Sequence, residues 1–248
     1  MIRMLAVIFL LLLPQVQDEY KRGRPTSKGV DKYVERNEYQ FVIDYQNHVG
    51  DTLFYEPFIS SDDLTKYYHY TGVESGWFER PDNIIVNNHS QYIDYELSRL
   101  SRFRKSQYRE ATMFVRAVVM HELTHAYVYQ IMMKCQYDKT LEYEWRQGLR
   151  MLPTDNWFTE FIEEGICEWV VEDMGEMIGY DEEVVLIKKD LDNRNSYEIK
   201  YRYSKQFVSP IIEEFGLEAA IYMVLSNAPP NREEVLNPKQ YYDRLKWN

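Results

Sequence analysis

The chain has 248 residues, 45% of them hydrophobic, which is enough to bury a full core in one domain or two small ones. Its net charge of −11, with the acidic residues spread along the chain, excludes a basic surface that would follow phosphates, so we expect no nucleic acid among its partners. The 22 tyrosines indicate extensive aromatic packing and assign no function by themselves.

An apolar run opens the chain at residues 4–13 (MLAVIFLLLL) and ends at Pro14. Ten residues are too few to cross ~30 Å of hydrocarbon at ~1.5 Å per residue, but they suit the central part of a secretory signal. Residues 15–17 (QVQ) lack the small residues of a cleavage site, so an uncleaved anchor and a buried N-terminal element are the alternatives. We therefore expect a secreted or extracytoplasmic protein in which residues 1–17 are a signal peptide or membrane anchor, with any membrane association through residues 4–13.

A polar stretch with Gly and Pro follows at residues 18–37, which predicts a linker before a single domain at residues 38–248. The domain begins with residues 38–45 (EYQFVIDY), which alternate as a strand does. Residues 51–59 are a weaker strand candidate.

A pair of short strands is predicted within residues 72–88 (GVESGWFERPDNIIVNN). One strand is centred on Trp77 and Phe78 and the other on residues 84–86, with a turn at 81–83 between them. The sheet is therefore expected in the N-terminal half of the chain.

Helical periodicity dominates from residue 107 onwards. Residues 107–134 contain no Gly or Pro, and their apolar residues recur at three- and four-residue steps. A second helix is predicted over 156–174, with Gly175 as its stop. Further helices are predicted at 181–191, 203–216 (interrupted at Pro210), 217–227 and 238–246. This order, sheet first and helices afterwards, predicts an α+β fold in which a small N-terminal mixed sheet packs on a mainly helical core.

The long helix contains the segment MHELTHAY at residues 120–127, with two histidines four positions apart. At ~3.6 residues per turn, His121 and His125 project from one face, so that a nitrogen of each can reach a zinc ion at ~2.0–2.1 Å. Glu122 lies on the neighbouring stripe, where it can reach a metal-bound water without binding the metal. The spacing predicts a zinc site with these residues as ligand, base and ligand; the alternative is a pair of core histidines satisfied by hydrogen bonds.

A catalytic zinc site needs a third protein ligand and an open position for water. No third histidine lies within a dozen residues after His125, which excludes the metzincin pattern. A carboxylate from the second helix is the alternative, and that helix offers Glu160, Glu163 and Glu164. The spacing does not separate these three residues.

The second helix resembles that of the gluzincin metallopeptidases, in particular the small peptidase-MA-like group, whose pattern is roughly E-G-x-A-E-[YW]. Here residues 164–169 read Glu-Gly-Ile-Cys-Glu-Trp, with Cys167 where the family usually has Ala. The resemblance implies a zincin-like core, a Zn²⁺ cofactor and Glu164 as the third metal ligand. It also implies that Glu168 accepts a hydrogen bond from the free ring nitrogen of a liganding histidine, His121. The alternative for Glu168 is a solvated helix charge.

Two flanking segments extend the resemblance over about residues 72–216. The strand pair before the zinc helix is similar to the family's substrate-aligning edge, which implies that Trp77 and Phe78 bind substrate. The segment YRYSKQFVSPIIEEFG at 201–216 is similar to a recurrent family segment, and it implies that Tyr201, with Tyr203 as the alternative, steadies the oxyanion. One departure is the spacing of 39 positions between the second histidine and the glutamate ligand, which residues 135–156 must fill.

These observations lead us to expect a zinc metallopeptidase that hydrolyses peptide or protein substrates. Zinc would activate a bound water, and Glu122 would act as the general base. The alternatives are a catalytically inactive zincin-fold protein used for binding or scaffolding and an exported domain without metal. Cys135 and Cys167 lie beside apolar residues, so we expect them to be small buried hydrophobic side chains; a disulfide between them is the alternative.

Overall fold

The computed structural model describes residues 27–53, 56–66, 75–79, 82–89, 107–137, 157–175, 183–192 and 198–246. In that part of the chain the fold is α+β, with seven α-helices and one three-stranded mixed sheet. None of the helices described there is both long and apolar enough to cross a membrane. The signal or anchor predicted at residues 1–17 lies outside the described residues, as do residues 138–156 of the segment that fills the gap between the two motif helices.

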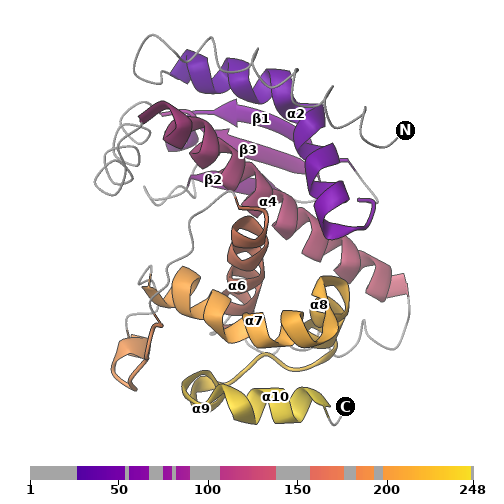
Figure 1. Cartoon of the computed structure of the whole chain (residues 1–248), viewed down its shortest axis with the longest axis vertical. Helices are drawn as coiled ribbons and strands as arrows, with labels where there is room; N and C mark the ends of the chain where they lie inside the picture. Colours follow the sequence, from indigo (N-terminus) through magenta and orange to yellow (C-terminus); the bar gives the residue numbers. More distant parts are fainter. Residues whose placement is uncertain are drawn as a thin grey trace, which may run out of the picture.

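Helix α2 (Ser27–Val49) occupies the place of the strand predicted at residues 38–45 and extends back into the predicted linker. Both predictions are wrong there, because the burial pattern is helical over the whole element. Its buried apolar residues are Val30, Tyr33, Val34, Phe41, Val42 and Tyr45. An eight-residue window shows alternation, whereas the spacing of three and four residues needs the longer stretch to become visible. The helix packs against β1 (Phe58–Asp62) and α4 (Gln107–Tyr137) (Figure 1).

The sheet contains β1 (Phe58–Asp62), β2 (Gly76–Glu79) and β3 (Asn83–Asn87) in the order β1-β3-β2. β1 runs parallel to β3, and β2 runs antiparallel to it. The strand pair predicted within 72–88 is thus confirmed, while the weaker candidate at 51–59 contributes only its last two residues to β1. The middle strand β3 is the buried one, and β2 lies at an edge of the sheet.

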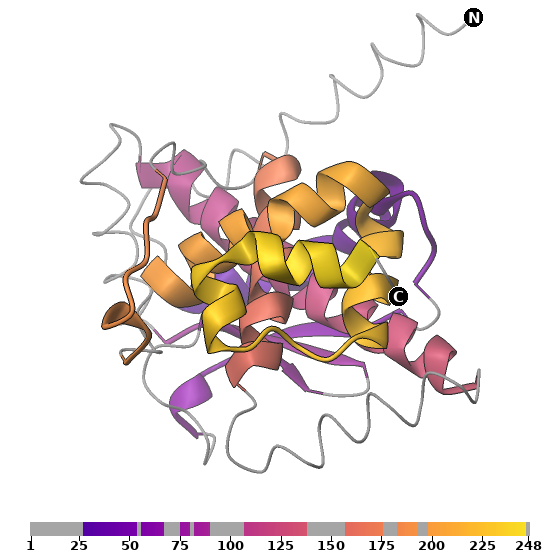
Figure 2. The same ribbon diagram turned by 90° about the horizontal axis from the view of Figure 1, so that it is seen from below.

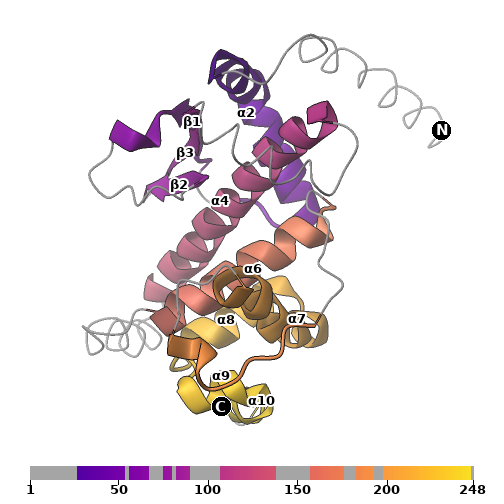
Figure 3. The same cartoon turned by 90° about the vertical axis from the view of Figure 1, so that its left-hand side faces the viewer.

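Helix α4 (Gln107–Tyr137) confirms the long helix predicted from residue 107. It contacts β2 and β3 on one side and α6 (Trp157–Asp173) and α8 (Leu217–Ser226) on the other, so it runs between the sheet and the C-terminal helices (Figure 3). Val119, Met120, Leu123 and Ala126 are fully buried in this position. The segment with the two histidines therefore lies between the sheet and the C-terminal helices.

The C-terminal half is a group of helices, and four of them match the predictions: α6 (Trp157–Asp173), α7 (Ser204–Phe215), α8 (Leu217–Ser226) and α10 (Pro238–Lys246). Gly175 follows α6 with a φ of 69°, the left-handed conformation that ends a helix, as predicted. Helices α9 (Arg232–Leu236) and α10 form the end of this group farthest from the sheet (Figure 1), and they lie in front in the view from below (Figure 2).

Three C-terminal features differ from the predictions. Residues 183–187 do not form the predicted helix. Their exposure alternates with a period of two, and Val185 and Ile187 are 75% and 49% exposed, so no continuous apolar helix face is buried there. Helix α9 (Arg232–Leu236) was not predicted, and its signal is a capping box between Asn231 and Glu234. A six-residue π-helix, η3 (Glu198–Tyr203), runs directly into α7.

Candidate metal centre

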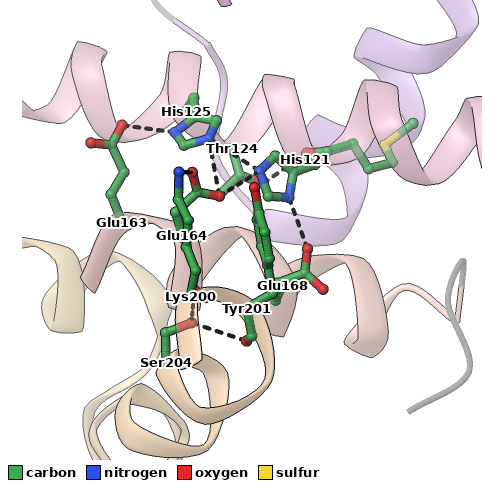
Figure 4. Close-up of polar contacts among 10 residues, drawn as sticks. His121, Thr124, His125, Glu163, Glu164, Glu168, Lys200, Tyr201 and Ser204 are labelled. Carbon is green, nitrogen blue, oxygen red and sulfur yellow. Dashed lines mark hydrogen bonds and ion pairs between the residues drawn. The ribbon is translucent and has the colours of Figure 1, made fainter. Parts of the chain in front are cut away.

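The two histidines of α4 point toward α6, as the four-residue spacing requires (Figure 4). Their rings lie edge to face with centroids 4.9 Å apart, and the Nε2 atoms of His121 and His125 are 3.1 Å from each other. Both side chains are largely buried, with 14% and 16% exposed. Two imidazole nitrogens therefore meet at one point between the helices.

The other nitrogen of each ring is hydrogen-bonded to a carboxylate on α6. Nδ1 of His121 lies 3.1 Å from Glu168 Oε1, and Nδ1 of His125 lies 2.8 Å from Glu163 Oε1. An ionised carboxylate can only accept, so each Nδ1 carries the hydrogen. In the neutral rings, both Nε2 atoms then present lone pairs to each other, an arrangement that is repulsive without a cation or proton between them.

A third electron-pair donor comes from Glu164, whose carboxylate enters the same point from α6. Its Oε2 lies 3.0 Å from His121 Nε2 and 3.9 Å from His125 Nε2. This oxygen is buried, and no donor in the described part of the chain is aligned to hydrogen-bond with it. Tetrahedral zinc with bonds of ~2.0–2.1 Å separates its ligand atoms by about 3.3–3.4 Å. The three separations bracket that value, so the three atoms fit around a zinc ion.

Electrostatics in this cluster favour a cation. Burial alone would raise the pKa of Glu164, but the proximity of His121, His125 and Lys200 lowers it to about 2. Burial alone would also lower the pKa of His121, but the carboxylates of Glu164 and Glu168 raise it well above its usual range. Without a metal, a proton between the rings would supply the positive charge that the carboxylates attract.

Cys167 adds a fourth candidate ligand. Its sulfur and a nitrogen from each of His121 and His125 all lie within 4.8 Å of one another, so these three residues could hold a metal ion. The thiol is free and fully buried, as the sequence predicted, and burial raises its pKa well above the usual range. As a ligand, it would have to lose its proton to the metal.

Glu122 is 8% exposed and faces the sheet. A Cβ added to Gly76 of β2 would lie 2.9 Å from Glu122 Oε1 and 2.6 Å from Val118 Cγ1, so the backbone of the edge strand lies directly against this carboxylate. Burial raises the pKa of Glu122, and the nearby His125 and His121 oppose that shift. A carboxyl with a raised pKa is a suitable base for a proton that must later be returned.

The two tyrosines considered for the oxyanion differ in position. Tyr201, on η3, points toward the histidines, with its ring centre 6.2 Å from that of His121 (Figure 4). Tyr203 is buried, and its hydroxyl donates a 2.6 Å hydrogen bond to the carbonyl oxygen of Val235 on α9. The structure thus brings Tyr201 to the cluster and directs Tyr203 into the core.

The predicted substrate-binding residues lie on the edge strand. Phe78 faces α4, where its ring packs against that of Tyr129 with centroids 6.0 Å apart. Trp77 is the intervening residue of the strand and projects to the opposite face of the sheet. Gly76 and Phe78 therefore face α4, whereas the Trp77 side chain points away from it.

Gly165 explains how the cluster is held together. A Cβ at this position would lie 2.4 Å from the carbonyl oxygen of Ser204, so α6 meets the start of α7 backbone to backbone. Ser204 in turn donates its hydroxyl to the carbonyl oxygens of Lys200 and Tyr201. This close approach places η3 beside Glu164.

Three contributors to the cluster were missed by the sequence analysis: Glu163 as a partner of His125, Lys200 as a partner of Glu164, and Cys167 as a potential ligand. A signal existed for Glu163, because two metal-binding histidines need two groups to orient them. No signal existed for Lys200, which reaches the cluster from another element.

Comparisons with protein-family models, with curated proteins and with solved structures find no match for this chain.

Proposed function

We propose that this protein is a zinc-dependent metallopeptidase of gluzincin type with a zincin-like core. Zn²⁺ would be held by His121, His125 and Glu164. The observation that carries the proposal is the convergence of two imidazole Nε2 atoms and one carboxylate oxygen, while both Nδ1 atoms are bound by other carboxylates. A structural hydrogen-bond network would pair donors with acceptors, whereas three acceptors at one point suit a cation.

Glu164 is preferred to Cys167 as the third ligand for two reasons. Its Oε2 is close to both ring nitrogens, at 3.0 and 3.9 Å, and it is already ionised. The Cys167 thiol holds its proton firmly, since burial raises its pKa well above the usual range. Cys167 would therefore remain a small buried side chain beside the site.

When bound, zinc would polarise the scissile carbonyl group and lower the pKa of a coordinated water toward ~7. Glu122 would be the general base that accepts a proton and returns it to the leaving amine, a role that its buried position beside the edge strand supports. Tyr201 donates its hydroxyl hydrogen to the developing oxyanion. The edge of β2 aligns an extended peptide by main-chain hydrogen bonds, with Phe78 on the helix side.

The test is zinc content and peptide hydrolysis by the purified full-length chain, with Glu122→Gln as the diagnostic variant. We expect bound zinc in both proteins and turnover of internally quenched peptides by the wild type. The variant should lose roughly 10²–10⁴-fold in kcat, because general base catalysis typically supplies that factor. Glu172→Gln, a partly exposed position of α6 that pairs with Lys205, is the matched control and should keep wild-type turnover.

The measurements separate this proposal from the two alternatives. A protein that binds zinc in this site but hydrolyses no peptide would be a scaffolding or binding protein with a retained metal. A protein that binds no zinc would be a domain in which the histidines are structural.

A further inference from the structure

The two oxygens of Glu164 have different surroundings. Oε2 faces the ring nitrogens of the two histidines, as described above. Oε1 lies 3.1 Å from Nζ of Lys200, whose side chain is 26% exposed (Figure 4). One oxygen therefore faces the metal position, and the other is paired with an ammonium group.

The negative charge around the two histidines favours an ammonium group beside Glu164. Four carboxylates surround the two histidines, those of Glu122, Glu163, Glu164 and Glu168. A divalent cation would offset two of these charges, and Lys200 would offset a third. Without Lys200, Glu164 would also have a free second oxygen that could turn toward the metal.

Lys200 is anchored through its backbone. It lies in the π-helix η3, a wide type of turn that often occurs at functional sites. Its carbonyl oxygen accepts the hydroxyl hydrogen of Ser204, and Ser204 is the residue that touches Gly165. Because Gly165 directly follows Glu164, this contact brings the backbone of Lys200 close to the backbone of Glu164. The ammonium group of Lys200 therefore lies beside Oε1 of Glu164.

We propose that Lys200 is a positioning residue that holds Oε1 of Glu164, so that this glutamate binds the metal through Oε2 alone. This inference rests on the proposed zinc site. It assigns Lys200 no contact with substrate or metal. Single-oxygen binding would keep the site at three protein ligands and one open position, the arrangement of catalytic rather than structural zinc.

The experiment compares Lys200→Met, which keeps the aliphatic stem and removes the charge, with Lys200→Arg, which keeps a cationic donor. The zinc dissociation constant is measured by competition with a chromophoric chelator, and the coordination of Co²⁺ in the same site is followed by visible absorption. We expect Lys200→Met to bind zinc ~10–100-fold more weakly, as is typical when a ligand loses its orienting partner. Its Co²⁺ absorption should weaken, because a glutamate that binds through both oxygens raises the coordination number. Lys200→Arg should recover most of the affinity and the spectrum.

Lys205→Met is the matched control, since Lys205 lies five positions later and pairs with Glu172 outside the cluster. It should leave both readouts unchanged. Should Lys200→Met not fold, Lys200→Gln removes the charge with a polar side chain, and the same comparison applies to it. Wild-type zinc affinity and an unchanged Co²⁺ spectrum in the charge-removing variant would overturn the proposal.

These readouts separate the two proposals. If the wild type binds zinc, Lys200→Met weakens that binding and no peptide is hydrolysed, the peptidase function fails and the role of Lys200 stands. If the wild type hydrolyses peptide while Lys200→Met behaves as the wild type, the role of Lys200 fails and the function stands. A wild type that binds no zinc would overturn both.

Discussion

Two largely buried glutamates in the C-terminal half of the molecule differ in how the protein satisfies their carboxylate oxygens. Glu234 on α9 is 7% exposed, and donors serve both of its oxygens. Arg244 donates Nε to Oε1 at 2.8 Å and Nη2 to Oε2 at 3.1 Å, and the backbone N–H of Asn231 donates to Oε2 at 2.8 Å. This carboxylate is satisfied entirely by the protein.

Glu164 on α6 is also largely buried, with 12% of its side chain exposed, but only one of its oxygens is satisfied in this way. Oε1 is paired with the ammonium group of Lys200, while Oε2 faces the Nε2 atoms of two rings whose Nδ1 atoms donate to Glu168 and Glu163. The comparison teaches that burial and an ion pair do not identify a site, because Glu234 has both. What distinguishes Glu164 is a convergence of acceptors, an arrangement that could hold a metal ion.

The largest effect is expected when the Glu164 carboxylate is removed. Glu164→Ala leaves two protein ligands, and we expect zinc affinity to fall by well over the ~10–100-fold that loss of an orienting group produces. Glu160→Ala is the matched control on the same helix, because Glu160 is exposed and the sequence spacing alone did not exclude it as a ligand. Dissociation constants measured in one buffer decide the matter. Equal affinities for the two variants would mean that Cys167 or another group is the third ligand.

A second prediction concerns the two carboxylates that hold the histidine rings. Glu163→Ala and Glu168→Ala should each weaken zinc binding ~10–100-fold, since each frees one Nδ1 that is now hydrogen-bonded at 2.8 or 3.1 Å. Glu163→Gln and Glu168→Gln keep an acceptor oxygen, and they should recover part of the loss. If Glu163→Ala binds zinc like the wild type, the hydrogen bond to His125 has no role in metal binding, and Glu168 alone orients the pair.

The sequence predicted the elements that local periodicity determines. α4 and α6 were found because they are long and regular, and β2 and β3 because they flank a clear turn. α2 was missed because its residues 38–45 alternate over a short window, although the whole helix buries residues at three- and four-residue steps. A short-range sequence pattern therefore predicts an element correctly when the pattern holds over the whole length of that element.

The residues of the candidate site also differ in how far the sequence predicts them. His121, Glu122 and His125 follow from their spacing on one helix, and the resemblance favours Glu164 among three carboxylates. Lys200 lies on another element, and its contact with Glu164 depends on the close approach at Gly165. A contact made by the packing of two elements leaves no periodic trace in the sequence, so residues of this kind need the structure.

The approach at Gly165 provides a third prediction, with a smaller effect. Gly165→Ala would place a Cβ 2.4 Å from the Ser204 carbonyl oxygen, so α6 and α7 must separate. We expect a loss of about 1–3 kcal/mol in the free energy of unfolding by urea, despite the ~1 kcal/mol that Ala gains over Gly in a helix. Zinc affinity should also fall, because η3 moves with α7.

Gly175→Ala is the matched control for that variant. Gly175 has a φ of 69° and open space around its Cβ position, so alanine there strains the backbone without a collision. It should lower stability and leave zinc affinity unchanged. Unchanged zinc affinity in Gly165→Ala as well would show that the contact between α6 and α7 stabilises the fold without setting the geometry of the site.

The smallest effect is expected at Glu234, the glutamate whose oxygens are both satisfied by the protein. Burial alone would raise the pKa of Glu234, but the hydrogen bonds from Arg244 and from the Asn231 backbone lower it below its usual value. A carboxyl whose pKa is lower in the folded protein stabilises it fully above the unfolded pKa of ~4.3–4.5, and that contribution disappears as the pH falls through the lower folded value. Glu234→Gln should therefore reduce the free energy of unfolding by roughly 1 kcal/mol at pH 7, with a difference from wild type that stays constant down to about pH 5 and shrinks below it.

Urea unfolding with a chelator present at several pH values between 7 and 3 measures that difference, and zinc affinity at pH 7 should be the same in both proteins. A difference that grows as the pH falls, or an effect on zinc, would mean that Glu234 is not the purely structural carboxylate against which Glu164 is compared.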